Sequence, residues 1–286
     1  MQALRDPDDE RRRAQDLRAL RPPAFTAALN LSLLTIFLAS IPLSFLALDR
    51  HPRLAAVLTP WMVFAFTGLF ILAHEAIHGT LVPGRPRLGH ALGRLAAFAY
   101  AFMDYGRLRA RHAQHHAAPQ SPDDPDAHAS GRFLPHLFAF ALRYLRWWQV
   151  ALLVLVGNRV GQAGHTFAML FAYVLPVVCS TLVVFSLGIF LVHHPRLAQR
   201  GLADARHRTV AIDPGLLPSL LSILFFNYHW LHHEHPHLTW LSLGRLRVRE
   251  PLRISLTQAL RELRATARDP APASLPPAPG SSGGSA

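Results

Sequence analysis

The stretch LAAVLTPWMVFAFTGLFILAHEAIH, Leu54–His78, runs from an uncharged apolar segment directly into a histidine motif. The part up to Ala73 is long enough, as a helix, to cross a hydrocarbon core of about 30 Å. The last five residues match H-E-x-x-H, which places His74 and His78 one helical turn apart on the same face. The stretch therefore predicts a membrane-spanning helix that ends in a pair of metal ligands.

Further apolar runs predict further spans. Ala24–Leu48 and Phe167–Val192 are uncharged and long enough to cross, whereas Trp147–Val156 is short and needs its flanking residues to do so. Gly89–Tyr105 is weakly apolar and carries Arg94, which favours a re-entrant or interfacial helix. Hydrophobic residues make up 51% of the chain and charged residues only 16%. We therefore expect an all-α polytopic membrane protein with about four transmembrane helices.

The arginines predict the orientation of these spans. All 29 basic residues are arginine, and in a four-span arrangement only Arg50, Arg53 and Arg159 lie opposite the histidine motifs. The positive-inside rule then places the N-terminus, the C-terminus and a helical cap with the histidines on the cytoplasmic side of a bacterial inner membrane. The net charge of +12 thus follows from topology and contact with membrane lipids, which argues against nucleic acid as a partner.

The composition also predicts three parts in the chain. Residues 1–23 form a charged, partly disordered N-terminal segment, 24–245 the membrane domain, and 246–286 a helix followed by a disordered tail rich in proline, glycine and serine. The single cysteine, Cys179, lies in an apolar run and excludes an internal disulfide, a four-cysteine iron–sulfur cluster and a c-type haem motif. Electrons for any redox reaction must therefore come from outside the chain.

Two more histidine motifs follow the first, each with i, i+3, i+4 spacing on one helical face. RHAQHH contains His112, His115 and His116, and NYHWLHHEHPH contains a second triple: His229, His232 and His233. Eight imidazoles exceed the needs of one ion, but they suit two irons that each keep a position open for oxygen. Zinc is the alternative metal.

Two other classes of protein remain open at this point. An intramembrane zinc protease would use Glu75 as general base and would need an aspartate ligand from a later span, which Phe167–Val192 lacks. A non-enzymatic metal carrier would more readily place its ligands within the spans than beyond their ends. In an iron centre, Glu75 becomes a candidate to hold the second ring nitrogen of a histidine.

The three motifs, HxxxH, HxxHH and HxxHH, resemble those of the membrane fatty-acid desaturase and hydroxylase superfamily, whose histidine boxes bind a non-haem di-iron centre. Within it, HEAIHGTLVPGRPR, RHAQHHAAPQSPDDPD and NYHWLHHEHPHLTW are most similar to the bacterial β-carotene 4-ketolases, over about Leu54–Leu243. Two positions depart from that pattern. Glu75 stands where these ketolases usually have aspartate, and Leu224 where many have histidine.

The resemblance implies a set of iron ligands and a set of residues that orient them. His193 matches a ninth ligand, with His194 as the competing choice. Asp124 and Asp126 match an acidic pair, although a proline-flanked turn explains them equally well. The implied ligands are His74, His78, His112, His115, His116, His193, His229, His232 and His233, and the orienting candidates are Glu75, Asp124, Asp126, Asn227 and His235.

The resemblance also implies an activity. The C4 methylene of a β-ionone ring in a β-carotene-type carotenoid would be oxidised to a ketone, with dioxygen as co-substrate and no catalytic residue beyond the metal site. A ferredoxin-type donor would be attracted to arginines such as Arg107, Arg109 and Arg111, although binding of anionic lipid headgroups explains these arginines equally well. A fatty-acyl desaturase and a carotenoid ring hydroxylase remain alternatives, because both would use the same boxes.

Overall fold

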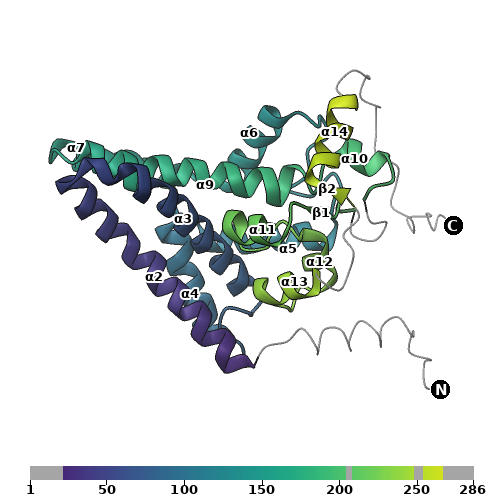
Figure 1. The fold of residues 1–286 in the computed structure, drawn as a ribbon, viewed down its shortest axis with the longest axis horizontal. Helices are drawn as coiled ribbons and strands as arrows, with labels where there is room; N and C mark the ends of the chain where they lie inside the picture. Colours follow the sequence, from purple (N-terminus) through teal and green to yellow (C-terminus); the bar gives the residue numbers. More distant parts are fainter. Residues whose placement is uncertain (1–21, 204–207, 248–253, 267–286) are drawn as a thin grey trace.

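The computed structural model describes residues 22–203, 208–247 and 254–266, and these are mostly helical (Figure 1). The first long helix is α2 (Pro23–Arg50), and the turn η1 (Pro52–Leu54) leads into α3 (Ala55–Ile77). The last long stretch joins several pieces end to end: α8 (Thr166–Met169), η2 (Leu170–Val174), α9 (Leu175–Phe185), η3 (Ser186–Phe190) and α10 (Pro195–Gln199). Both η2 and η3 are π-helical turns.

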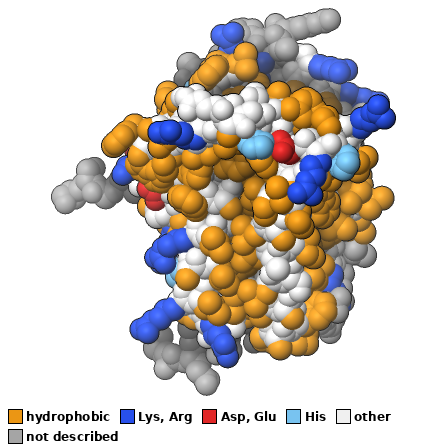
Figure 2. Space-filling view, turned by 90° about the vertical axis from the view of Figure 1, so that its left-hand side faces the viewer, with side chains coloured by type: hydrophobic (Ala, Val, Ile, Leu, Met, Phe, Trp, Pro, Cys, Tyr) orange, Lys and Arg blue, Asp and Glu red, His pale blue; other side chains and the backbone are white. Residues whose placement is uncertain are grey.

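Three helical stretches are long and apolar enough to cross a membrane. Pro23–Arg50, Pro52–Ile77 and Thr166–Gln199 have mean hydropathies of 2.2, 2.0 and 2.5. They contain the three long apolar runs of the sequence, and the expected all-α membrane class is confirmed. On the face shown in Figure 2, hydrophobic side chains dominate the middle and arginines lie toward the edge. This apolar surface suits contact with lipid.

The predicted span around Trp147–Val156 takes a different form. Helix α7 (Trp147–Gln162) is only about 24 Å long, shorter than a hydrocarbon core. It reaches spanning length only together with α6 (Phe133–Tyr144), and the two helices are bent by 93° at the break between them. The pair is therefore a broken span or a re-entrant loop, and no proline or glycine in Leu145–Arg146 signals the bend.

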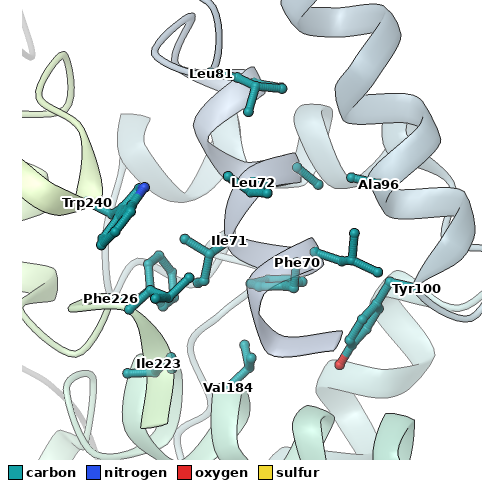
Figure 3. Packing of buried hydrophobic residues seen from close by; sticks show 14 of the residues in the cluster. Phe70, Ile71, Leu72, Leu81, Ala96, Tyr100, Val184, Ile223, Phe226 and Trp240 are labelled. Atoms are coloured by element: carbon teal, nitrogen blue, oxygen red, sulfur yellow. The ribbon is translucent and has the colours of Figure 1, made fainter. Parts of the chain in front are cut away.

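Helix α3 is the centre of the core. Its residues from Ala65 to Ala76 are all buried, and α2, α9 and α4 (Pro86–Ala99) pack around it. Figure 3 shows its side chains between Phe226 and Trp240 on one side and Ala96 and Tyr100 on the other. This packing anchors the C-terminal end of α3, where the first histidine motif lies.

Short elements form a cap beside the long helices (Figure 1). They are α5 (Tyr105–Ala117), α11 (Leu216–Ile223), α12 (His229–Glu234), α13 (Trp240–Arg247) and α14 (Leu256–Thr266). The one departure from helix in named elements of the described chain is a two-residue parallel pair, β1 (Ile212–Asp213) with β2 (Ile254–Ser255). The predicted disordered ends fall outside the described residues, apart from 22 and 23, so the domain boundaries stay predictions.

The turn between α11 and α12 sets the position of the third histidine motif. Leu224 and Phe225 both have positive φ angles, of 46° and 62°, which side-chain-bearing residues rarely adopt. The turn sends the next ring, Phe226, against Gly188, where an added Cβ would lie 2.6 Å from the ring. Glycine at position 188 therefore lets η3 and the turn before α12 approach closely.

Candidate metal centre

The three histidine motifs lie on three helices that converge. His74 and His78 lie at the C-terminal end of α3. His112, His115 and His116 lie on α5, whose N-terminus is capped by Asp104: its carboxylate accepts the Arg107 N–H at 3.0 Å. Three more lie on α12: His229, His232 and His233. Most of these side chains are buried; only His78 and His116 are partly exposed. Segments more than a hundred residues apart thus share one site.

The nitrogens fall into two sets of four. The first histidine group is His74, His78, His112 and His232, and the second histidine group is His115, His193, His229 and His233. Within each group the nitrogens that face one another lie within 4.8 Å. The Nε2 atoms of His78 and His112 are 2.7 Å apart, and those of His115 and His233 are 2.9 Å apart.

The one motif histidine that belongs to neither set of four, His116, lies between the two groups. Its Nε2 is 3.0 Å from Nε2 of His232, a member of the first group. Its ring is stacked on His233 of the second group, with centroids 4.3 Å apart. The motif spacing predicted that His116 lies near the other histidines, but it does not indicate to which of the two groups the ring belongs.

The choice between His193 and His194 has a clear geometric answer. His193 is buried in the second group, with its ring 4.7 Å from that of His115. His194 turns the other way: its Nδ1 accepts the Arg196 N–H at the start of α10, and its Nε2 donates to the Gly131 carbonyl at 3.1 Å. His193 is therefore the candidate ligand.

The nitrogens of both groups fit a cation better than they fit one another. A neutral imidazole has a single N–H, so it cannot supply hydrogens for several close nitrogen neighbours at once. Within the described residues, Nδ1 of His74, Nδ1 of His229 and both ring nitrogens of His193 are buried without a hydrogen-bond partner. Convergent imidazole nitrogens of this kind are the donor set of transition-metal sites.

The protonation state of the rings also suits metal binding. Burial lowers the pKa of His78 to about 4. Burial, together with the neighbouring imidazoles, also lowers the pKa values of His112, His229, His232 and His233. These rings are neutral at pH 7, and the neutral form is the one that offers a lone pair to a metal.

One histidine of the second group is backed by carboxylates. Nδ1 of His115 donates to Oδ1 of Asp124 at 2.9 Å, and Oδ2 of Asp126 is 3.8 Å away. Burial alone would lower the pKa of His115, but Asp126 and Asp124 outweigh it and raise that pKa. The bond fixes the ring so that Nε2 faces the group, the usual role of a carboxylate behind a metal-binding histidine. Both predicted aspartates thus lie beside the centre.

Two further residues support this acidic pair, and the sequence analysis did not identify them. The Gln120 backbone N–H donates to Asp124 at 2.7 Å, and its side-chain amide donates to the His193 carbonyl at 2.6 Å. The Tyr144 hydroxyl donates to Asp126 at 2.5 Å. A lone glutamine or tyrosine carries no spacing signal, so only the folded arrangement identifies them.

The other orienting candidates lie elsewhere. Glu75 is buried, but its carboxylate accepts hydrogen bonds from the Thr80 hydroxyl at 2.7 Å and from the Trp240 backbone, not from a histidine ring. Asn227 donates to Ser219 at 3.0 Å, which joins α11 to the turn before α12. His235 is buried just after α12, outside both groups. These contacts hold the helices that carry the histidines.

A cavity of about 230 Å³ adjoins both histidine groups. His74 and His112 of the first group and His229 of the second contribute to its wall. The rest is mainly apolar and comes largely from α3, α6, α7 and α9, with residues such as Phe70, Phe140, Leu153 and Val184, and from Phe226 in the turn before α12. The sequence analysis did not predict which residues line this cavity. An apolar molecule held here would contact the imidazoles directly.

Comparisons with known proteins agree with this arrangement. Residues 51–163 match the fatty acid desaturase family. A β-carotene ketolase of Paracoccus sp. strain PC1 is 34% identical over 199 residues, covering 69% of this chain and 81% of that protein. A β-carotene ketolase of a second Paracoccus strain is 32% identical, covering 72% and 84%. A zeaxanthin 4-ketolase of Chlamydomonas reinhardtii is 29% identical, covering 85% of this chain and 58% of that protein.

Proposed function

The chain belongs to the β-carotene ketolase family of desaturase-like membrane enzymes, and from this premise we propose that it oxidises the C4 methylene of β-ionone rings to a ketone. The substrate is a β-carotene-type carotenoid. The observation that carries the proposal is the apolar cavity whose wall includes histidines of both groups. A ring in this cavity lies against the metal centre.

The metal is iron in this proposal, with one ion in each histidine group. Four ligands per group come from the chain, and His116 is the ninth ligand. Two bound irons supply the reduction of dioxygen, which no protein side chain performs. Zinc lacks this redox chemistry, although imidazoles bind it well. Iron therefore agrees with an oxidation reaction, whereas zinc does not.

The chain itself positions the ring, excludes water and fixes its own imidazoles. Phe70, Phe226 and Val184 keep the cavity apolar beside the histidines. Asp124 holds the N–H of His115. Two successive hydroxylations at C4 give a geminal diol, which loses water to leave the ketone. The outward side chains of Leu142 and Trp147, on the α6–α7 wall, are more than three-quarters exposed. They are suited to face lipid, from which the carotenoid enters.

The electron donor is a small acidic ferredoxin-type protein on the cytoplasmic side. Helix α5 supports this choice because it carries the histidines on its buried face and arginines on the other. Arg107, Arg111 and Arg146 line a polar surface hollow together with Asp104 and Gln114. A donor docked there is separated from the centre by about one helix diameter, roughly 10 Å. Opposite charges would guide its approach.

Expression in a bacterium that accumulates β-carotene tests the activity. We expect colonies to turn from yellow to orange or red, with mono- and diketone found by chromatography and mass spectrometry. Unchanged carotenoid with new double bonds in membrane lipids would instead support a fatty-acyl desaturase. Hydroxylated carotenoid without ketone would support a ring hydroxylase. Metal analysis of the purified protein should give about two irons per chain, whereas one zinc would contradict the di-iron site.

A further inference from the structure

The cavity wall contains five polar side chains besides the histidines, and in four of them the polar groups are paired with one another. They are Tyr100, Asp126, Tyr144, Gln149 and Thr181. The Tyr100 hydroxyl lies 2.8 Å from the Thr181 hydroxyl, and Tyr144 donates to Asp126. These four groups need nothing from a bound molecule. The exception is the amide of Gln149.

Gln149 has an unused hydrogen-bond donor. Its side chain is 1% exposed, and its Oε1 accepts the backbone N–H of Arg146 at 2.7 Å at the start of α7. Because a backbone N–H can only donate, the amide atom facing it must be the oxygen. The NH2 group is therefore turned away from this bond, and no hydrogen bond from it to another described residue is formed at the cavity wall.

The position of Gln149 on α7 makes this donor unexpected. Gln149 and Leu153 lie one turn apart on the same face of α7 and both line the cavity, as does Leu145 just before the helix. Leucine on either side predicts a third apolar residue between them. A buried amide that lacks a partner is disfavoured, so its presence in an apolar stripe points to a ligand that carries a polar group.

This part of the wall is also tied to the metal centre. Tyr144 lies five residues before Gln149, lines the same cavity and donates to Asp126. Asp126 in turn lies 3.8 Å from Nδ1 of His115 in the second histidine group. The end of α6 is therefore connected to the centre through two buried side chains, and Gln149 lies just beyond it along the chain, in the wall of the same cavity.

We propose that the Gln149 amide donates a hydrogen bond to a hydroxyl group on the β-ionone ring, and so favours hydroxylated rings over unsubstituted ones. The inference rests on the proposed function and deepens it. The hydroxyl has two possible sources: a C3 hydroxyl already present, as in zeaxanthin, or the C4 hydroxyl that the first oxidation installs. Either one satisfies the donor, whereas the unsubstituted ring leaves it unpaired.

The test compares Gln149→Met with the unchanged protein in membranes given an equimolar mixture of β-carotene and zeaxanthin. Methionine keeps the length and removes the donor. We expect the ratio of zeaxanthin to β-carotene conversion to fall about tenfold if the C3 hydroxyl is held. If the C4 hydroxyl is held, 4-hydroxylated β-carotene should accumulate in place of ketone. Because both measures compare products of one preparation, a general loss of active protein cancels out.

Two controls keep the test decisive. Val150→Met places a methionine next to position 149 but on the exposed side of α7, outside the cavity lining, and should leave both measures unchanged. Gln149→Asn keeps an amide but withdraws it by one methylene group, so it replaces the methionine variant if that protein does not accumulate. An unchanged ratio without hydroxylated intermediate overturns the role of Gln149 while the ketolase activity stands. Failure of the unchanged protein to oxidise either carotenoid overturns the proposed function, and this inference with it.

Discussion

The two histidine groups use the same kind of ligand in different surroundings. The first histidine group, with His78 partly exposed, has no carboxylate bonded to a ring within the described residues. The second histidine group is buried throughout, and Asp124 and Asp126 lie behind His115. A carboxylate behind an imidazole makes it a stronger donor and fixes its orientation. The two groups would therefore differ in their affinity for a metal ion and in the charge around the bound ion.

The largest effect should come from a ligand of the second group. His115→Ala should abolish ketone formation and lower the iron content from two ions toward one, because the first group does not depend on His115. His165→Ala is the matched control, since that partly exposed histidine pairs with Asp49 away from the centre. Metal analysis and product chromatography on the same preparation check both. Retained iron and activity would remove His115 from the ligand set.

Removing the carboxylate behind His115 should have a smaller effect, limited to the metal ion of the second group. Asp124→Asn keeps the shape but weakens the acceptor for His115 Nδ1, so affinity for one of two ions should fall about 10- to 100-fold. Competition with a chelator should then show one tight and one weakened ion. Glu75→Gln is the comparison variant, since Glu75 bonds Thr80 rather than a histidine. Equal weakening of both ions would contradict the distinction between the groups.

The groups should also respond differently to pH. The pKa of His115 is raised, so in metal-free protein this ring holds a proton more tightly and must release it before binding. The pKa values of His78, His112 and His232 are lowered, and these rings stay neutral well below pH 7. Between pH 6 and 8, uptake of one metal ion should strengthen as pH rises, while the other changes little. Titration of metal-free protein at several pH values checks this, and two parallel curves would count against it.

The smallest expected effect concerns the outer face of α5. Arg109 is exposed and contacts neither group, so Arg109→Gln should leave iron content unchanged. The rate with an acidic ferredoxin should fall a few-fold and lose part of its dependence on salt, because surface charges mainly alter association. Stopped-flow reduction of the iron protein at several salt concentrations measures this. A rate that is unchanged would instead favour anionic lipid as the partner of these arginines.

Much of the fold followed from local sequence. Long uncharged runs predicted the spans containing α2, α3 and α9, since the length of a lipid-crossing helix is fixed by membrane thickness. The histidine motifs also predicted which side chains lie close together, because residues at i, i+3 and i+4 of a helix point to the same face. The bend of 93° between α6 and α7 was not predictable, because no proline or glycine lies at the break between them.

The assignment of histidines to groups could not be read from the motifs. On α5, His112 belongs to the first group and His115 to the second. On α12, His232 belongs to the first group, whereas His229 and His233 belong to the second. Each motif is therefore shared between two sites, a consequence of how three helices cross rather than of spacing along any one. Glu75 shows the same limit, since its partner Trp240 lies far along the chain.

The π-helical turn η3, just before His193, makes the end of this long helix tolerant of a length change. In a π turn one additional residue is accommodated by a wider loop of backbone, as the 3.1 Å bond from Leu191 N–H to the Ser186 carbonyl shows. Deleting Leu187 would restore an ordinary turn and leave the following histidine facing the same way. A deletion between Leu108 and His112 in α5 would instead rotate every later ligand by about 100°. A related chain can thus lose one residue before His193, but not within α5.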